Sequence, residues 1–255
     1  MSARIAVLVF PGTNSEDETL RVLRDCGGDA HLVHWSRGAL LANFDAYVLP
    51  GGFAYEDRIR AGAIAAHDTM MDHVIAGAQQ GKLVLGICNG AQILLEAGLV
   101  PGTAPIRRPT AAFTRNGPVP HFVCSHVYVK LAIDPGRCAL TRLLEHGELI
   151  PAWTANAEGR LAATAEHLRE LEDGDHIAFV YAHEDGSVDE TASPNQSALG
   201  VAGLCNREGN VLALMPHPER DAWTFNHPDR RRGGTMLAPS GGVALFRSFV
   251  EVLNR

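Results

Sequence analysis

The sequence has few cysteines, and none lies in a pattern that would indicate a secreted or metal-stabilised protein. The five cysteines are an odd number without a C-x-x-C pair, so they predict neither a disulfide framework nor a structural zinc site. Positive charge is also scarce, because 22 lysines and arginines against 29 aspartates and glutamates leave a net charge of −7. This balance disfavours a dedicated nucleic-acid-binding protein.

Long apolar runs are missing as well. The longest, residues 83–95, is too short and too polar to cross a bilayer, and no signal-peptide pattern is found at the start. The sequence contains no G-x-x-x-x-G-K-[ST] phosphate loop, no dinucleotide-binding G-x-G-x-x-G and no metal-binding H-E-x-x-H. We therefore expect a cytoplasmic protein that has no nucleic-acid or membrane partner and holds no metal.

The first 90 residues alternate between strand-like and helix-like patterns. Aliphatic and β-branched runs predict strands at residues 4–10, 31–35, 44–49 and 82–87, with helical spacing at 15–26 and 58–79. Strand, crossover helix and strand repeated in this way predict an α/β fold, in which a parallel sheet is covered on both faces.

The pattern changes after Gly98, where prolines interrupt the chain. Alternation around residues 122–130 predicts antiparallel strands or a hairpin inserted on the parallel core. Later elements are expected as a helix or loop at 166–175, strands at 177–181, 198–205 and 211–215, and an amphipathic helix at 241–254. No repeat or low-complexity linker divides the chain, so residues 1–255 are expected to form one domain.

The sharpest local pattern surrounds Cys88, where a buried strand stops at Gly86 and a helix begins two or three residues later. This is the pattern of a nucleophile elbow, with sulfur in place of the serine oxygen. Gly86 and Gly90 permit the tight turn, and a helix N-terminus favours the thiolate form of a cysteine. The alternative is that Cys88 is a small buried hydrophobic residue at a strand end.

A second pattern, Met215-Pro216-His217-Pro218-Glu219, follows the last predicted strand. The prolines favour extended geometry, so His217 and Glu219 share one face. The carboxylate of Glu219 can then fix the imidazole tautomer while the other ring nitrogen faces a thiol. The alternative is a turn with a solvated acid, but active sites of parallel sheets collect at the carboxyl ends of the strands, where Cys88 is also expected.

Further candidates stand close to the cysteine. Gly51, Gly52 and Phe53 end the third predicted strand, and a backbone N–H of this turn, together with that of Asn89, would form an oxyanion hole. Gln92, one helical turn after the cysteine, would hydrogen-bond a substrate. Their alternatives are an ordinary turn and an ordinary exposed glutamine.

Together these blocks resemble the class I, or triad-type, glutamine amidotransferases. The resemblance is strongest to one branch, the glutaminase subunits of phosphoribosylformylglycinamidine synthases of purine biosynthesis. It extends over most of the chain and rests on the segments Phe10-Pro11-Gly12-Thr13-Asn14, Leu49-Pro50-Gly51-Gly52-Phe53-Ala54-Tyr55, Gly62-Ala63-Ile64-Ala65, Gly86-Ile87-Cys88-Asn89-Gly90 and Met215-Pro216-His217-Pro218-Glu219-Arg220.

The resemblance implies a flavodoxin-like doubly wound sheet and a catalytic triad of Cys88 as nucleophile, His217 as general acid and base, and Glu219 as orienting carboxylate. L-glutamine would be hydrolysed through a cysteine thioester, and the ammonia would pass to a partner synthetase, with a small third subunit as a possible further partner. This chain would hold no cofactor. ATP, magnesium and formylglycinamide ribotide would be bound by the synthetase.

Three segments depart from the family's pattern. They are Phe53-Ala54-Tyr55-Glu56-Asp57, where the family has Phe-Ser-Tyr-Gly-Asp, Asn156-Ala157-Glu158-Gly159 in place of His-Gly-Glu-Gly, and Ser193-Pro194-Asn195-Gln196-Ser197 in place of Asn-Pro-Asn-Gly-Ser. They bear on substrate entry and partner docking rather than on the triad.

Three rival functions remain open at this level. The chain could serve another acceptor within the same amidotransferase class, but the blocks near residues 10 and 62 disfavour that. A cysteine peptidase or deglycase of the same fold would usually carry histidine directly after the cysteine, where this chain has Asn89. A non-catalytic module would be expected to have lost Cys88, His217 or Glu219.

Overall fold

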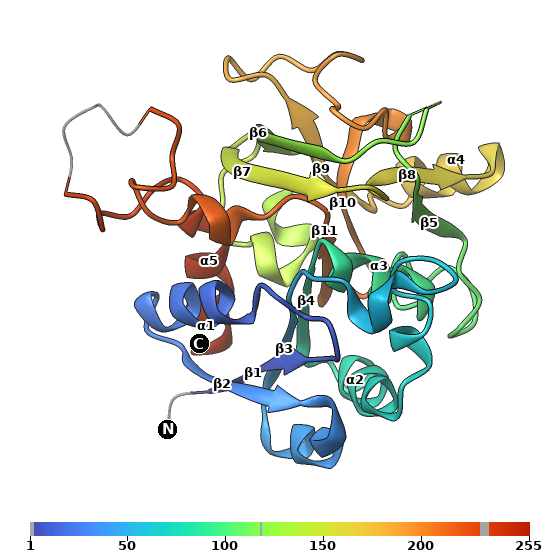
Figure 1. Cartoon of the computed structure of the whole chain (residues 1–255), viewed down its shortest axis with the longest axis vertical. Coiled ribbons are helices and arrows are strands. Elements are labelled where there is room, and N and C mark those ends of the chain that lie inside the picture. The colour runs from blue at the N-terminus through green and yellow to red at the C-terminus, as the bar shows by residue number, and fades with distance from the viewer. Residues whose placement is uncertain (1–2, 118, 230–234) are drawn as a thin grey trace.

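A nine-stranded mixed sheet organises the molecule, seen here in a computed structural model that describes residues 3–117, 119–229 and 235–255. The strands lie in the order β2-β1-β3-β4-β11-β10-β9-β6-β7. Figure 1 shows the parallel half with its helices below and the antiparallel strands above. The expected α/β fold with an antiparallel addition is confirmed.

The parallel half contains five strands, whose order is the 2-1-3-4-5 arrangement of flavodoxin-like sheets. They are β1 (Arg4–Val9), β2 (Asp29–His34), β3 (Ala46–Leu49), β4 (Leu83–Ile87) and β11 (Val211–Leu214), and all neighbouring pairs run parallel. Every residue of β3, β4 and β11 is buried. These continuous apolar runs form strands because both faces of the sheet are covered by helices.

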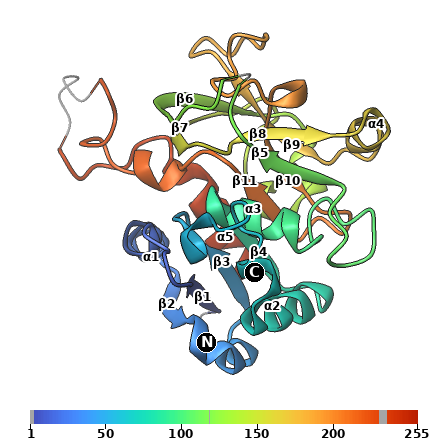
Figure 2. The ribbon, with the colours of Figure 1, turned by 45° about the vertical axis from the view of Figure 1, so that its right-hand side comes forward.

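Helices cover both faces of the parallel half (Figures 1 and 2). On one side α1 (Glu16–Asp25) packs against α5 (Val243–Leu253), and on the other lie α2 (Thr69–Gln79) and α3 (Asn89–Glu96). Because β3, β4 and β11 run in the same direction, the loops that follow them meet at one edge of the sheet.

The antiparallel half continues the same sheet beyond β11. Its strands are β10 (Val201–Cys205), β9 (Ile177–Ala182), β6 (Val123–Leu131) and β7 (Leu149–Asn156), each antiparallel to its neighbour. A separate ribbon pairs β5 (Ala111–Thr114) with β8 (Arg160–Ala163), and α4 (Ala165–Asp173) follows it. β7 ends near the edge where the loops after β4 and β11 meet, and so brings a distant part of the sequence to it.

Two expected elements are shorter than the sequence pattern indicates. Helical spacing at 58–79 yields an α-helix only from Thr69, where Asp68 accepts the Met70 N–H and caps the helix. The preceding segment instead forms 3₁₀ turns, with left-handed backbone at Tyr55 and Ile59. The strand expected at 198–205 begins at Val201, because Leu199 also has a left-handed backbone that a strand cannot contain.

Within the described ranges, with their gaps at 1–2, 118 and 230–234, no helix combines the length and apolar character needed to cross a bilayer.

Candidate active site

Cys88 stands on a strained turn between β4 and α3. Its backbone angles are φ 51° and ψ −107°, in a region that residues other than glycine rarely adopt. The turn can close tightly because Gly90 has no side chain: a Cβ there would lie 2.0 Å from the Leu49 carbonyl oxygen. The side chain is nearly buried, and its Sγ lies 3.9 Å from the Ala155 carbonyl oxygen on β7. This is the geometry expected of a nucleophile elbow.

His217 and Glu219 form a buried pair after β11. Nδ1 of His217 lies 2.5 Å from Oε1 of Glu219, and both side chains are almost inaccessible to solvent. The 3₁₀ turn Pro218–Asp221 places the carboxylate beneath the ring. The backbone of His217 also pairs with Trp153 of β7, through hydrogen bonds of 2.7 and 3.1 Å in the two directions. The imidazole is therefore fixed from two sides.

The charges around His217 favour its protonated form. Burial by itself lowers the pKa of the imidazole, but the charges of Glu219 and Cys88 outweigh it and raise this pKa from 6.5 to about 9. The second carboxylate oxygen of Glu219 has no hydrogen-bond partner among the described residues. The negative charge of a buried carboxylate stabilises a protonated imidazole beside it.

The turn after β3 presents unused backbone donors, because neither the Gly51 nor the Gly52 N–H donates to another described residue. The Phe53 N–H donates to the Gly12 carbonyl at 2.8 Å, whereas the Gly52 N–H donates to no other described residue. Asn89 begins α3, where the first N–H groups have no acceptor inside the helix. The Gly52 and Asn89 N–H groups are thus free to meet a substrate oxygen, whereas the Phe53 N–H is not. Phe53 contributes a half-exposed ring to the cavity wall instead.

The side chains of Asn89 and Gln92 are engaged inside the protein. Asn89 accepts the Ala54 N–H at 2.9 Å and donates to Gln92 Oε1 at 2.9 Å, and Gln92 donates to the Glu158 carbonyl at 2.7 Å. Asn89 also donates to Asp57, whose pKa is raised to about 6 mainly by burial and further by the charge of Glu158. A substrate contact to Gln92 would have to replace one of these bonds.

A cavity of about 120 Å³ lies at the carboxyl edge of the sheet and joins these groups. It is lined by Asn14, Gly52, Phe53, Cys88, Phe122, Ala155, His217 and Arg220. A water molecule occupies about 30 Å³ in the liquid, so the cavity has room for a few heavy atoms, such as a carboxamide and its adjoining carbons.

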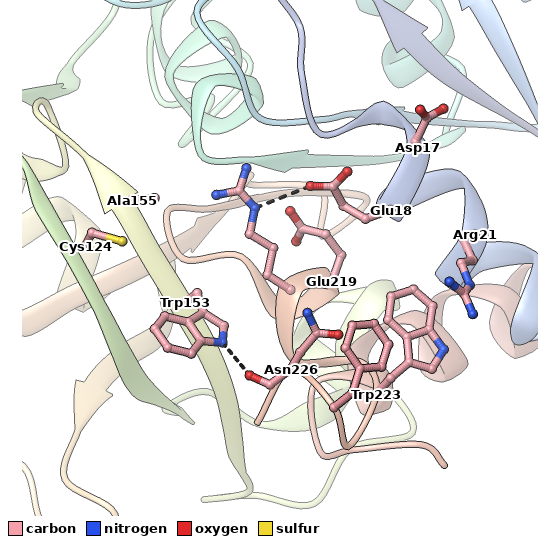
Figure 3. Close-up of a pocket in the computed structure, with 11 residues that line it drawn as sticks. Asp17, Glu18, Arg21, Cys124, Trp153, Ala155, Glu219, Trp223 and Asn226 are labelled. Atoms are coloured by element: carbon pink, nitrogen blue, oxygen red, sulfur yellow. Dashed lines mark hydrogen bonds and ion pairs between the residues drawn. The ribbon is translucent and has the colours of Figure 1, made fainter. Parts of the chain in front are cut away.

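A wider groove of about 690 Å³ adjoins this cavity and shares Ala155 and Arg220 with it. Figure 3 shows Cys124, Trp153 and Ala155 on one side of the groove and Asp17, Glu18 and Arg21 of α1 on the other. Arg220 stands between the two spaces, where its guanidinium contacts Ser15 Oγ at 2.8 Å and Glu18 at 3.4 Å.

Gly51 makes room for the imidazole, a role that its place in an ordinary turn does not reveal. A Cβ at this position would lie 2.4 Å from Cε1 of His217. We expect Gly51→Ala to lower kcat for glutamine hydrolysis by about 100-fold, because displacing the ring by about 1 Å misaligns it with the sulfur. The overpacking should also lower the melting temperature by about a few degrees. Gly136→Ala, at an exposed position, is the matched control and should retain full activity; an active Gly51→Ala enzyme would contradict this role.

None of the three departing segments contains a triad residue. Glu56 is exposed and pairs with Arg58. Asn156 is buried, where it accepts a hydrogen bond from Asn116 and donates one to Thr154. Gln196 has a left-handed backbone and lines a separate surface cavity.

Three contacts of the site were not foreseen from the sequence: the Ala155 carbonyl near the sulfur, the Trp153 backbone pair and the space at Gly51. Each joins segments that are more than 60 residues apart. No local pattern could have indicated them.

Comparison with known proteins gives a consistent result. A family model described as a CobB/CobQ-like glutamine amidotransferase domain matches residues 2–252. A curated relative from Pyrococcus furiosus, phosphoribosylformylglycinamidine synthase subunit PurQ, is 39% identical over 97% of both chains. The PurQ subunit of Aquifex aeolicus is 41% identical over 85% of this chain and 90% of that relative.

Solved structures show the same fold. A chain in the structure of PurLQS from Thermotoga maritima aligns with a TM-score of 0.76 and 28% identity, and covers 98% of this chain and 99% of that one. The glutaminase domain of Trypanosoma brucei CTPS with bound acivicin aligns with a TM-score of 0.55 over 98% of this chain and 94% of that one. At 14% identity, this similarity supports a shared fold and no more than that.

Proposed function

The chain belongs to the CobB/CobQ-like glutamine amidotransferase family, and from that premise we propose that it is the glutaminase subunit of a phosphoribosylformylglycinamidine synthase. The resemblance read from the sequence is thereby confirmed at the level of the family. One observation carries the chemical proposal: Cys88, on a strained elbow, opens into the same cavity as His217, whose far side is held by Glu219.

The reaction proposed for this site has two halves. The Cys88 sulfur, whose proton passes to His217, attacks the side-chain carboxamide carbon of L-glutamine while the Gly52 and Asn89 N–H groups stabilise the developing oxyanion. The C–N bond then breaks, His217 gives its proton to the departing nitrogen, and ammonia leaves behind a glutamyl thioester.

Water completes the reaction. His217 takes a proton from the attacking water, the C–S bond breaks, and glutamate is released with the thiolate restored. Glu219 remains a carboxylate throughout and stabilises the imidazolium whenever it forms. The net change is glutamine plus water to glutamate plus ammonia, so no oxidant or metal enters the balance.

The partners follow from the relatives. The PurLQS structure supports assembly of this chain with a synthetase subunit and a small third subunit. ATP and magnesium are proposed to bind on the synthetase, which would use the ammonia to convert formylglycinamide ribotide to formylglycinamidine ribotide. Phe53 is proposed to contact glutamine at the cavity rim. Gln92 is proposed to reach the substrate by exchanging one of its internal hydrogen bonds. We further propose a single domain over residues 1–255 and a cytoplasmic location, which five free cysteines support.

Reconstitution of the complex tests the acceptor. The purified chain should form formylglycinamidine ribotide from glutamine, ATP and formylglycinamide ribotide only when the cognate synthetase is present. Glutamine hydrolysis should also be faster in that mixture than with the chain alone. Equal hydrolysis with and without the synthetase would contradict control by the partner, and an ammonia product without ribotide conversion would point to another acceptor.

A further inference from the structure

A cluster of potential metal ligands lies next to Trp153, which lines the groove, and outside the catalytic triad. His126 of β6, Asp221 at the end of the 3₁₀ turn and His227 of the following loop bring one ligand atom each to within 4.8 Å of one another. We propose that these three side chains bind one divalent transition-metal ion, with zinc as the best match.

The ligand types and spacing fit this chemistry. Two imidazoles and one carboxylate form a common protein site for zinc, with bonds of about 2.0–2.2 Å and a fourth position filled by water. Ligand atoms around a tetrahedral zinc are then about 3.3 Å apart. Nε2 of His126 and Oδ2 of Asp221 are 2.8 Å apart, so replacing the shared proton by an ion requires only a small separation of the two atoms.

The surroundings orient the ligands as an outer shell does in metal sites. Asp221 is fully buried, and Ser240 Oγ donates to its other oxygen at 2.6 Å. The His126 ring packs edge to face against Tyr128, Trp153 and His227, with centroids 5.0 to 5.3 Å apart. His227 accepts the Asp229 N–H at 3.1 Å within an exposed loop, and binding at this ring rearranges that bond.

The position of the cluster gives the ion a structural role. Asp221 ends the turn that carries Glu219, and His227 lies on the loop that continues from it. An ion here would tie both segments to His126 on the antiparallel half of the sheet. It lies apart from the Cys88 cavity and takes no part in the proposed glutamine chemistry, so its test is independent of that function.

Metal binding to the full chain tests this site directly. All variants carry Cys88→Ser and Cys124→Ser, so that these thiols do not compete for zinc, and are stripped with chelator before equilibrium dialysis against zinc sulfate. We expect one zinc per chain and a raised melting temperature. His227→Gln should weaken binding by at least about tenfold. His183→Gln is the matched control, because His183 pairs with Asp189 on the surface and has no third ligand in the described chain.

Cobalt gives a second readout. Bound Co²⁺ should show tetrahedral d–d absorption without a sulfur-to-metal charge-transfer band, and His227→Gln should lose that absorption. Three results would overturn the proposal: less than half an equivalent of zinc bound, equal affinity in the His227→Gln and parent proteins, or equal loss in the His183→Gln control. The last two would mean that zinc binds elsewhere or without specificity.

Discussion

Replacing Cys88 by alanine is expected to abolish glutamine hydrolysis, with a loss in kcat of at least about 10⁴-fold. The substitution removes the sulfur atom that forms the thioester. A water molecule in its place would be a much weaker nucleophile. The melting temperature should stay close to that of the parent protein, because alanine fits the space that the thiol leaves. Release of ammonia and glutamate from glutamine is the measurement.

The complex with the synthetase separates a lost nucleophile from a lost fold. With Cys88→Ala in the complex, formylglycinamidine ribotide should no longer form from glutamine but should still form when ammonium salt supplies the nitrogen. Cys124→Ala, at an exposed cysteine, is the matched control and should keep glutamine-dependent activity. Activity of Cys88→Ala with glutamine would remove the cysteine from the mechanism, whereas failure with both nitrogen sources would indicate disrupted assembly.

Glu219→Gln is expected to lower kcat for glutamine by about 10³ to 10⁴-fold while leaving KM nearly unchanged. The amide keeps the shape of the carboxylate but loses its charge, so it no longer stabilises the imidazolium and can hold the ring in the wrong tautomer. A steady-state comparison of kcat and KM with the parent enzyme provides the test. A variant within tenfold of the parent would show that Glu219 does not orient His217.

The same variant should change the titration of His217. Burial lowers the pKa of the imidazole, and the Glu219 charge is one of the two charges that oppose this effect. When that charge is removed, the pKa should fall from about 9. Because the folded-state pKa of the parent is raised above 6.5, His217 contributes stability that is complete below pH 6.5 and is lost as the pH rises toward 9. Proton NMR between pH 6 and 9 should show a lower imidazole pKa in Glu219→Gln than in the parent. Unfolding over the same range should show a smaller loss of stability with rising pH. Identical titration in both proteins would contradict the assigned cause.

The strand periodicity and the elbow were readable from sequence because both are local patterns. Residues 4–10 and 82–87 carry continuous apolar runs that are typical of strands buried on both faces. The structure has β1 and β4 there. The glycines around Cys88 predict a tight turn. In the structure, a Cβ at Gly86 or Gly90 would clash with neighbouring atoms. The pairing of His217 with Glu219 was equally accessible, since two residues in an extended segment share a face.

Contacts between distant segments were beyond the reach of such patterns. Helical spacing at 58–79 predicted a helix, but left-handed residues near Tyr55 and Ile59 are consistent with a loop tied to its neighbours, and the pattern contains no information about that. Nor does a Pro-Gly-Gly turn reveal that the Phe53 N–H donates to the Gly12 carbonyl and so is not available to a substrate oxygen. The His126–Asp221–His227 cluster escaped notice for the same reason, because 95 residues separate its first two members.

The backbone pair between Trp153 and His217 ties the catalytic histidine to the antiparallel half of the sheet. The site therefore has a high contact order: its cysteine follows a parallel strand, its histidine is set by β7, and neither segment can complete the site alone. Helices make local contacts, whereas this bridge joins segments far apart in the sequence, and contacts of that kind form slowly. Glutaminase activity then reports arrival at the whole native topology, and the parallel core by itself, even if it folds, would lack a positioned base.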